Sequence, residues 1–497
     1  MLGGLSASRT GRAIIVIEAH DVAAVRAAEA ELIALLPDGA LMRRAAIGLA
    51  TICARTLGRV SGARVVVLAG SGSNGGDALH AGAWLARRGA RVDAVLLSSR
   101  THEEGLAALR GAGGRVCSAP QGAEPAALDQ AEDLVRLADL VLDGIVGIGG
   151  SGALRPGAAR LVAAARSTSR GLLIAVDVPS GVDASTGETA GEAVRADLTV
   201  TFGTHKPGLL IDPGATYAGS VSLVDIGLGP HLGQPGIEVL EAEDVAGLLP
   251  VPAGESDKYS RGVVGVVAGS DQYAGAAVLC TGGAVRAGAG MVRYAGPDHA
   301  ADLVRARWPE VVVGEGRVQA WTLGSGLGEG PEAQGRIEQA LGSDQPAVVD
   351  ADGLRHLAQL GHGRSGPTLL TPHAGELARL LDMERSAVEA RRLHHARHAA
   401  DQFGATVLLK GSTTVVADPG GTVRVNPTGT PWLATAGTGD VLAGICGALL
   451  AAGLSPLDAG SVGAWLHGIA GQRAARDAPL SAGQLLEEIP AAWRAAG

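Results

Sequence analysis

The chain has 497 residues, and its 41 basic and 50 acidic side chains leave a formal net charge of −9. Because its Lys and Arg residues are scattered, whereas neutralising a nucleic-acid backbone takes clustered basic residues, the sequence argues against a nucleic-acid-binding protein. An apolar content of 46% excludes a mostly disordered chain, and the length suggests about two to four domains.

Glycine is unusually frequent, with 76 residues, whereas aromatic residues make up only 2% of the chain. Each glycine costs conformational entropy on folding, so such a number calls for a reason. The positions of the glycines therefore decide whether they are filler or mark places where the backbone approaches a ligand.

The cysteines and the apolar runs indicate in which cellular compartment the protein is expected. The four cysteines lie far apart and show no metal-ligand spacing, which is typical of thiols in a reducing cytosol. Near the N-terminus, Glu18 and Asp21 interrupt a short apolar run before it reaches the length of a signal peptide. The apolar residues 441–454 are too few to span a bilayer, so a buried helix is expected there. We expect a cytoplasmic protein that does not enter a membrane.

In the first half of the chain, short β-branched segments alternate with Ala-rich helical segments. Strands are predicted at residues 65–68, 92–97, 140–142, 172–176, 198–202 and 221–224. Such alternation is typical of a parallel sheet covered by helices on both faces. The first domain is therefore predicted to be a Rossmann-like, three-layer α/β domain.

Polar side chains and glycines follow several of these strands. The segment AGSGSNGGD at residues 69–77 lies between the first strand and a helix predicted at residues 78–88, so its amides can face an anion. Asn74 and Asp77 add oxygens there that suit a cation or hydroxyl groups. Asp143, Asp177 and Ser180 lie at the ends of later strands. Ligands of open α/β sheets bind at the carboxyl ends of strands, so these five side chains are expected to converge on one crevice.

Four motifs in this half resemble the epimerase domain of the NAD(P)H-hydrate repair enzymes over about residues 10–228. They are SNGGD at 73–77, DGIVGIGG at 143–150, DVPSG at 177–181 and TFGTHKPG at 201–208. The resemblance implies a potassium ion held by Asn74, Asp143 and Ser180, and a contact between Asp177 and the hydrated nicotinamide. It also implies a dinucleotide lined by Asn74, Gly75, Gly76 and Asp77 and by Gly147, Ile148, Gly149, Gly150, Ser151, Gly152 and Ala153.

Epimerisation at C6 of the hydrated nicotinamide requires an acid/base group close to the C6 hydroxyl, and we assign this role to Asp177. Lys206, in the fourth motif, either assists electrostatically or forms a structural ion pair, and the sequence leaves both open.

The alternation of strands and helices lapses over residues 227–256, where Gly and Pro accumulate, and a domain boundary is expected there. Strands resume at residues 263–267, 311–313, 347–349, 369–370 and 407–409. The segment ATAGTGD at 434–440 then runs into the apolar residues 441–454. Gly437 and Gly439 leave bare amides at this helix start, which suits a phosphoryl group, and Asp440 lies in the first turn.

The GTGD sequence resembles the catalytic motif of ribokinase-like small-molecule kinases. Together with KYSRG at 258–262, GSGLG at 324–328, TPHAGE at 371–376 and KGSTT at 410–414, it resembles the ADP- or ATP-dependent NAD(P)H-hydrate dehydratases over about residues 240–497. The resemblance implies a ribokinase-like α/β domain in which Ala276, Gly326, His373 and Asp440 contact the hydrate. It also implies that Lys410, Gly411, Ser412, Thr413, Thr414 and Gly439 hold the adenine nucleotide.

These observations predict one chain with two active sites, an epimerase at residues 10–228 and a dehydratase at 240–497. The first would interconvert the R and S forms of hydrated NADH and NADPH. The second would use ADP or ATP to phosphorylate the C6 hydroxyl of the S form, with Asp440 as base and with Mg²⁺ held chiefly by phosphates. The predicted partners are therefore the hydrate and an adenine nucleotide, and the Ala-rich apolar helices together with the family favour a homo-oligomer.

Two other functions remain open at this stage. One is a ribokinase-like cofactor or vitamin kinase with a Rossmann-like regulatory domain. The other is a binding protein whose first domain only recognises a nucleotide or a protein partner. The choice between ADP and ATP is also open.

Overall fold

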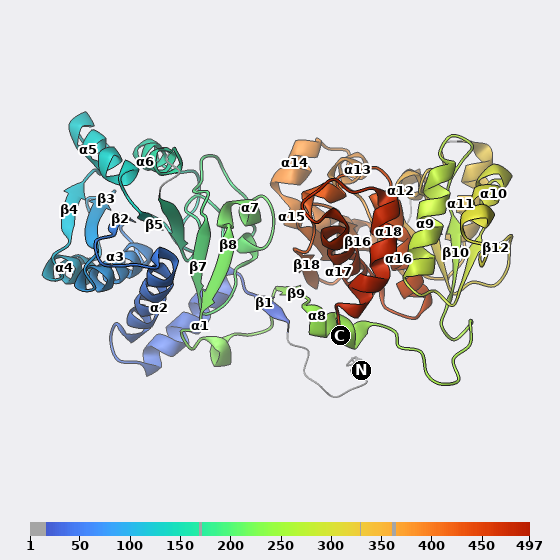
Figure 1. Ribbon diagram of the computed structural model, residues 1–497, viewed down its shortest axis with the longest axis horizontal. Helices are drawn as coiled ribbons and strands as arrows, with labels where there is room; N and C mark the ends of the chain where they lie inside the picture. The colour runs from blue at the N-terminus through green and yellow to red at the C-terminus, as the bar shows by residue number, and fades with distance from the viewer. Residues whose placement is uncertain (1–15, 168–170, 329, 360–363) are drawn as a thin grey trace. The chain divides into compact units, whose positions relative to one another are not determined.

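The structure is a computed structural model that describes residues 16–167, 171–328, 330–359 and 364–497 (Figure 1). It forms two compact units, one spanning Glu18–Gly236 and the other Ile237–Gly497, which also takes in residues 16 and 17. The division falls within the Gly- and Pro-rich stretch of residues 227–256. The described residues do not include residues 10–15 of the predicted first domain. They also leave out most of the N-terminal apolar run that was too short for a signal peptide.

The unit Glu18–Gly236 is built on a 7-stranded sheet in the order β4-β3-β2-β5-β6-β7-β8, in which every neighbouring pair is parallel. Its strands are β2 (Arg64–Ala69), β3 (Arg91–Leu96), β4 (Arg115–Ser118), β5 (Leu140–Gly144), β6 (Leu172–Val176), β7 (Leu198–Phe202) and β8 (Ser220–Val224). Its helices are α1 (Val22–Leu35), α2 (Ala40–Leu57), α3 (Ser73–Arg87), α4 (Glu103–Gly111), α5 (Pro125–Arg136), α6 (Pro156–Arg166) and α7 (Gly214–Ala218).

Helices cover both faces of this sheet. Val65 and Val67 of the central strand β2 lie in a core shared with α1, α2 and α3, whereas Val66 and Leu68 lie in a second core shared with α5 and α6. Alternate side chains of one strand therefore enter two different cores, as expected of a strand buried on both faces. The predicted Rossmann-like three-layer fold is confirmed, and Figure 1 shows α3 and α6 on opposite sides of the sheet.

The structure differs from the sequence prediction at the start of α3. The helix begins at Ser73 and not at residue 78, so Asn74 and Asp77 lie in its first turns and not in a loop. Glycines there disfavour a helix by propensity, but the backbone comes so close to the preceding turn that no side chain fits. A Cβ atom at Gly75 would lie 2.5 Å from the carbonyl oxygen of Gly70. Tertiary packing thus overrides propensity at this position.

The second unit is built on an 11-stranded sheet in the order β1-β9-β18-β17-β16-β15-β14-β13-β10-β11-β12. The strands are β1 (Ile17–Ala19), β9 (Ile237–Val239), β10 (Val263–Val267), β11 (Met291–Tyr294), β12 (Val312–Val313), β13 (Ala320–Leu323), β14 (Ala347–Val349), β15 (Thr368–Leu370), β16 (Thr406–Leu409), β17 (Thr414–Ala417) and β18 (Val423–Asn426). The run from β12 to β16 is parallel, and β17 pairs antiparallel with both of its neighbours.

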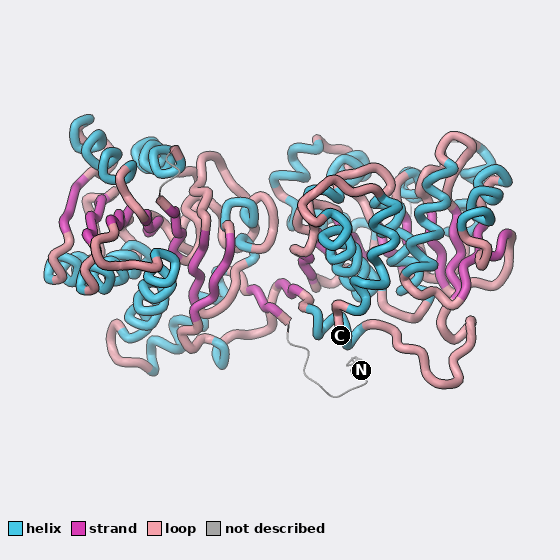
Figure 2. The backbone as a smooth tube through the Cα atoms, in the orientation of Figure 1, coloured by secondary structure: helices cyan, strands magenta, loops and turns pink. Residues whose placement is uncertain are grey.

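Helices flank this sheet too, as the cyan and magenta segments of Figure 2 show. They are α8 (Ala242–Leu248), α9 (Ala274–Arg286), α10 (Asp298–Arg307), α11 (Pro331–Leu341), α12 (Asp352–Gln359), α13 (Ala374–Leu380), α14 (Arg385–Ala390), α15 (Arg392–Phe403), α16 (Thr438–Ala451), α17 (Pro456–Ala475) and α18 (Ala482–Arg494). The predicted α/β class of this unit is confirmed.

The buried helix predicted at residues 441–454 is α16, which begins at Thr438 and is buried along nearly its whole length. It packs against α9 with the two backbones in close approach. A Cβ atom at Gly444 would lie 2.0 Å from the carbonyl oxygen of Cys280, and one at Gly283 would lie 2.3 Å from that of Val441. Some glycines of this chain therefore serve helix packing and not ligand binding.

Of the helices formed by the described residues, none has both the length and the apolar character that crossing a bilayer requires.

Candidate active sites

Asp143 and Ser180 meet at the carboxyl end of the first sheet. Asp143 ends β5 and is fully buried, and its carboxylate accepts hydrogen bonds from the Ser180 hydroxyl at 2.6 Å and from the Ser180 amide at 2.8 Å. Burial raises the pKa of Asp143 to about 6, and the hydrogen bonds from Ser180 and Ile145 oppose that rise. None of the described Lys, Arg or His side chains forms an ion pair with this buried carboxylate.

Asn74 lies close to the loop that follows Asp143. Its side chain is buried, its Nδ2 atom has no hydrogen-bond partner among the described residues, and a Cβ atom at Gly147 would lie 3.0 Å from its Oδ1 atom. The structure therefore brings the three predicted potassium ligands to one end of the sheet. Carboxylate, hydroxyl and amide oxygens are hard ligands, so this donor set fits an alkali-metal cation.

Asp177 follows β6 and faces a pocket. Its φ of 67° lies in the left-handed region, which non-glycine residues adopt rarely and Asp more often than most. Its Oδ1 atom accepts hydrogen bonds from Lys206 Nζ at 2.6 Å and from the Thr201 hydroxyl at 3.1 Å. Lys206 is buried and also donates to Thr201 and to the carbonyl oxygen of Phe202, both at 2.9 Å. The lysine therefore fixes the orientation of the Asp177 carboxylate.

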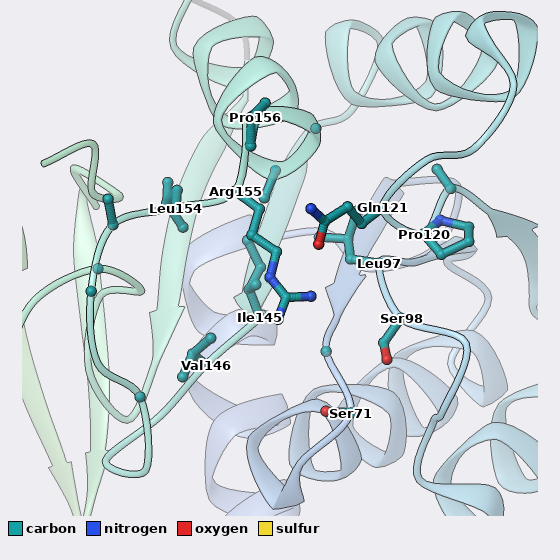
Figure 3. Close-up of a pocket in the computed structure, with 18 of the residues that line it drawn as sticks. Ser71, Leu97, Ser98, Pro120, Gln121, Ile145, Val146, Leu154, Arg155 and Pro156 are labelled. Atoms are coloured by element: carbon teal, nitrogen blue, oxygen red, sulfur yellow. The ribbon is translucent and has the colours of Figure 1, made fainter.

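Two pockets flank the loop after β5. One, of about 570 Å³, is lined by Asn74, Asp77 and Asp177 and by Ile148 and Gly149 of the predicted dinucleotide loop. The other, of about 400 Å³, is lined by the rest of that loop, namely Gly150, Ser151, Gly152 and Ala153, and Gly147 lines both. Figure 3 shows the smaller pocket, into which Arg155 and Gln121 extend. The predicted loop thus runs between two cavities.

Two predicted binding residues do not reach these pockets. Gly75 faces the carbonyl group of Gly70, and a Cβ atom at Gly76 would lie 2.8 Å from the ring of His102. Both glycines belong to the packing of α3, and neither is a lining residue of the two pockets.

The larger pocket also contains charged residues that the sequence analysis missed. Glu29 and Arg26 of α1 line it together with Asp77 and Asp177. Burial, followed by the charge of Asp177, raises the pKa of Glu29, and Lys206 and Arg26 oppose that rise. Sequence reasoning lacked any signal for Glu29, because an acidic residue in an Ala-rich helix is typical of a solvent-facing position.

In the second unit, Asp440 lies in the first turn of α16, after Gly437, which has a φ of 90°. Burial and then the charge of Asp350 raise the pKa of Asp440 to about 7, while Ser325 and Lys410 oppose that rise. A carboxyl group with this pKa is poised to exchange a proton near neutral pH. A Cβ atom at Gly439 would lie 3.4 Å from Lys410 Nζ, so the lysine reaches the same helix start.

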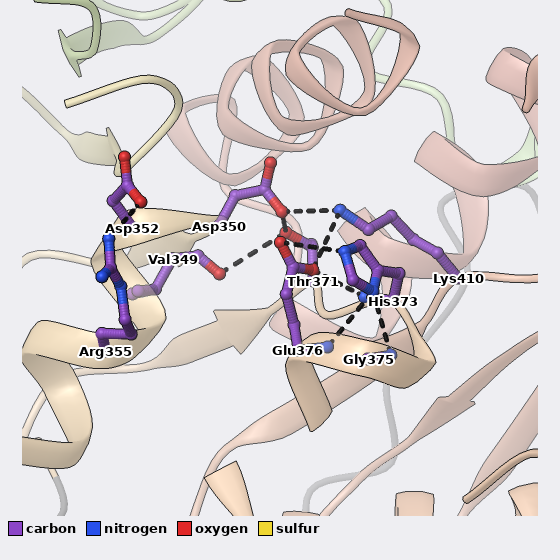
Figure 4. A network of polar contacts seen from close by, with 9 residues as sticks. All are labelled: Val349, Asp350, Asp352, Arg355, Thr371, His373, Gly375, Glu376 and Lys410. Atoms are coloured by element: carbon purple, nitrogen blue, oxygen red, sulfur yellow. Dashed lines mark hydrogen bonds and ion pairs between the residues drawn. The ribbon is translucent and has the colours of Figure 1, made fainter. Parts of the chain in front are cut away.

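Lys410 belongs to a network of polar contacts on three strand ends (Figure 4). Its Nζ atom lies 2.8 Å from Asp350 Oδ1 and 3.7 Å from Glu376 Oε2. Asp350 is buried and also accepts a hydrogen bond from the Thr371 hydroxyl at 2.8 Å. Burial alone would lower the pKa of Lys410, but Asp350 and Glu376 raise it above its ordinary value. The sequence analysis missed Asp350, although this residue directly follows a strand, as Asp177 does.

The predicted nucleotide loop, residues 410–414, is held by a buried arginine of α15. Arg392 Nη2 donates to the carbonyl oxygens of Leu409, Lys410 and Thr413 at 3.0–3.3 Å. A Cβ atom at Gly411 would lie 2.2 Å from the same nitrogen, so a side chain there would displace the guanidinium group. Ser412 lies in the same turn, and Thr414 begins β17. Nothing in the local sequence distinguishes Arg392 from Arg397, the other arginine of its helix.

The remaining predicted hydrate contacts are spread over two further turns. Gly326 has a φ of 63°, and a Cβ atom there would lie 2.7 Å from the Cβ atom of Ala276, so these two residues meet. His373 caps α13: its Nδ1 atom accepts hydrogen bonds from the amides of Gly375 and Glu376 at 3.0 and 3.1 Å. The side chain of His373 is 53% exposed, which leaves the rest of its ring open to a ligand.

Comparisons with known proteins match the two halves of the chain separately. A family model described as "YjeF-related protein N-terminus" matches residues 38–208. A second model, described as "NAD(P)H-hydrate dehydratase", matches residues 264–491.

Similar proteins extend over nearly the whole chain. The bifunctional NAD(P)H-hydrate repair enzyme Nnr of Mycobacterium tuberculosis (strain ATCC 25618 / H37Rv) is 52% identical over 88% of this chain and 89% of that protein. The enzyme of the same name from Mycobacterium leprae is 49% identical over 96% and 99%. A crystal structure of the ADP/ATP-dependent NAD(P)H-hydrate dehydratase from Bacillus subtilis, co-crystallized with ATP/Mg²⁺, is 29% identical over 52% of this chain and 98% of that chain, with a TM-score of 0.48. The resemblance seen in the motifs is confirmed, and the chain belongs to the family of bifunctional NAD(P)H-hydrate repair enzymes.

Proposed function

We propose that this chain repairs hydrated NADH and NADPH with two active sites, an epimerase in residues 10–228 and a nucleotide-dependent dehydratase in residues 240–497. The observation that carries the proposal is that each unit holds a carboxylate with a lysine close by at the carboxyl end of its sheet. In one unit Asp177 forms an ion pair with Lys206, and in the other Lys410 approaches the helix start that carries Asp440 and opposes the rise of its pKa. Two such sites in one chain suit two successive steps on one substrate.

In the epimerase unit, Asp177 is the acid/base group that acts on the C6 hydroxyl of the hydrate. Its pairing with the buried Lys206 supports this role, because the lysine holds the carboxylate toward the pocket. Asn74, Asp77, Gly147, Ile148 and Gly149 line the space for the nicotinamide half. The loop to Ala153 continues into the second pocket, which leaves room there for the remainder of the dinucleotide.

Asn74, Asp143 and Ser180 hold a potassium ion in this unit. The fully buried Asp143 carboxylate supports that assignment, since a cation would compensate its buried charge. When bound, the ion would supply a fixed positive charge next to the pocket. Replacing K⁺ in the buffer by tetramethylammonium, which is too large for such a site, is expected to lower the melting temperature and to slow epimerisation. An unchanged melting temperature in both salts would contradict a potassium site.

In the dehydratase unit, Asp440 removes the proton from the C6 hydroxyl while that oxygen attacks the terminal phosphoryl group of ADP or ATP. Hydroxide is a poor leaving group, whereas the phosphate so formed departs and restores the dihydropyridine ring. The backbone amides at Gly437 and Gly439 face the charge that develops at the helix start. Lys410 and residues 411–414 bind the nucleotide phosphates, and the phosphates chiefly hold Mg²⁺.

The protein is further proposed to be a cytoplasmic homo-oligomer. Leu35 and Ile47, which are 72% and 54% exposed, support an assembly because they are large apolar side chains on α1 and α2. Light scattering behind a sizing column measures the mass, and a monomer of 49.6 kDa at micromolar concentration would contradict the assembly.

The proposed function is tested by incubating the purified chain with mixed epimers of hydrated NADH, MgCl₂, KCl and ADP or ATP. The expected result is full recovery of the absorbance of the dihydropyridine from both epimers, and parallel reactions rank ADP against ATP. Asp177→Asn is expected to abolish recovery from the R form only. Accumulation of a phosphorylated product without any hydrate present would instead indicate a cofactor or vitamin kinase.

A further inference from the structure

The pocket next to Asp177 contains three carboxyl groups, and each comes from a different element. Glu29 is contributed by α1, Asp77 by α3 and Asp177 by the end of β6. Lys206 forms an ion pair with Asp177 at 2.6 Å, and Arg26 also lines the pocket. Asp77 is nine-tenths buried, and its Oδ1 atom has no hydrogen-bond partner among the described residues. This arrangement leaves carboxyl oxygens facing a ligand that the chain itself does not supply.

The three carboxyl groups differ in their surroundings. Asp177 has a buried ammonium group as its partner, whereas Asp77 and Glu29 form no ion pair with a Lys, Arg or His side chain of the described residues. Burial and then the charges of Asp177 and Glu29 raise the pKa of Asp77 well above its ordinary range. Burial and then the charge of Asp177 raise the pKa of Glu29, with Lys206 and Arg26 acting in the opposite direction. Carboxyl groups of one pocket are suited to act as acid and base when their surroundings favour the protonated form of one group and the ionised form of another.

Glu29 and Asp77 differ in their access to water. Asp77 lies within the buried first turns of α3, whereas Glu29 is only partly buried at the surface of α1. A group that gives up a proton in each turnover must regain it from solvent, which favours the more accessible carboxyl.

We propose that Glu29 is the general acid that works with Asp177 in the epimerisation, an inference that rests on the proposed epimerase function of this pocket. Glu29 donates its proton to the C6 hydroxyl, and the C6–O bond breaks with its electron pair on oxygen, so that water leaves. The lone pair of N1 then forms a second bond to C6. Water adds to the opposite face of C6, the pair returns to N1, and the surplus proton of the added water passes to Asp177. Proton exchange with solvent resets both carboxyl groups, and the reverse reaction exchanges their roles.

The test follows the conversion of purified R epimer to S epimer by the full chain, without nucleotide, by chromatography over a range of pH. Glu29→Gln is expected to lower kcat by about 10²- to 10⁴-fold, with little change in KM, since it removes a general acid. It should also abolish the alkaline limb of the pH profile, the fall of the rate as the pH rises through the pKa of Glu29, which reports the loss of the acid's proton. Glu29→Asp should keep that alkaline limb and part of the rate.

The matched control is Glu31→Gln, on the same helix. The Glu31 side chain is 66% exposed and contacts His231, so its variant should epimerise like the original chain. The proposal is wrong if Glu29→Gln keeps both its kcat and the alkaline limb, or if it raises only KM. It is equally wrong if Asp77→Asn removes the limb while Glu29→Gln retains it. If the original chain does not epimerise, or if Asp177→Asn epimerises normally, the proposed epimerase function fails instead.

Discussion

At the residue scale, the two units share one arrangement, in which a carboxylate and a lysine lie at the carboxyl end of a parallel sheet. The two arrangements differ in whether the lysine contacts the carboxylate directly. Lys206 donates to Asp177 directly, whereas Lys410 is bound to Asp350 and Glu376 and only approaches the helix start that carries Asp440. Lys206 is therefore placed to orient Asp177, whereas Lys410 has an ammonium group close to where a phosphoryl group would lie.

The pKa of Asp440 leads to a prediction for the pH dependence of dehydration. A base must be ionised, so kcat/KM for the S epimer is expected to rise with pH and to level off above about 7. Asp440→Asn removes the base and should lower kcat by about 10²- to 10⁴-fold. The assay is the recovery of absorbance from purified S epimer with saturating nucleotide. A variant that keeps its rate would show that another group accepts the proton.

The same shift predicts an effect on stability. Because the pKa of Asp440 is raised from 3.8 to about 7 in the folded chain, the folded state holds a proton that the unfolded state has lost between these two pH values. The free energy of unfolding therefore decreases as the pH rises through this window. Asp440→Asn should unfold at a higher temperature than the original chain at pH 8, and the difference should shrink toward pH 4. Thermal melts at both pH values measure it.

Arg392 yields a prediction about nucleotide affinity. Arg392→Lys loses the planar group that contacts three carbonyl oxygens of the 410–414 turn, so the turn should loosen. Since hydrogen bonds to charged groups contribute about 1.5–3 kcal/mol, KM for ADP or ATP is expected to rise about 10- to 100-fold. Arg385→Lys, which alters an exposed ion pair with Glu389, is the control. An unchanged KM in Arg392→Lys would mean that the turn does not need this support.

At the scale of elements, the contact between α9 and α16 positions the start of α16, where we propose that the phosphoryl group binds. Both helices carry glycines where the other helix's backbone touches them, so Thr438 to Asp440 are held against the sheet by close packing. His467 of α17 adds a hydrogen bond from its Nε2 atom to the carbonyl group of Thr438, with a separation of 2.9 Å. Burial lowers the pKa of His467 to about 4, so the ring stays neutral at physiological pH.

Gly444→Ala tests this contact. Its Cβ atom would lie 2.0 Å from the Cys280 carbonyl oxygen, so the helices must separate, at a cost of about 1–3 kcal/mol of unfolding free energy. Dehydration should slow, while epimerisation should persist under conditions in which the chain stays folded. Gly335→Ala in α11 is the matched control, because nothing lies within 4 Å of its Cβ position. That change should stabilise by about 0.5–1 kcal/mol. Equal effects of the two substitutions on stability would contradict the close packing.

At the scale of the whole molecule, each unit has its own sheet and its own buried cores, so the two reactions are expected to be separable. The S epimer made in one site is a small molecule that can diffuse to any copy of the other site. A mixture of Asp177→Asn and Asp440→Asn chains should therefore recover the R epimer, although neither variant does so alone. A mixture that stays inactive would show that the S epimer is not released between the sites.

The sequence by itself determined the fold class and the family, and it singled out Asp143, Asp177 and Lys410, which the structure places at strand ends. It could do so because short apolar runs between helical segments are visible in the sequence, and because glycine and acidic motifs such as SNGGD and GTGD are local features. The buried strands at residues 172–176 and 198–202 were predicted with the bounds that the structure has. The start of α3 was not, since contacts with Gly70 and His102 override the low helix propensity of Gly75 and Gly76.

Only the tertiary structure decided which other residues join these sites. Glu29 reaches the Asp177 pocket from a helix far upstream, and Arg392 supports the nucleotide turn from a different element. It also decided that Lys206 pairs with Asp177, and that glycines such as Gly444 serve packing. The physical reason is that burial, ion pairing and close backbone approach depend on distances between segments that are remote in sequence, and no local pattern encodes those distances.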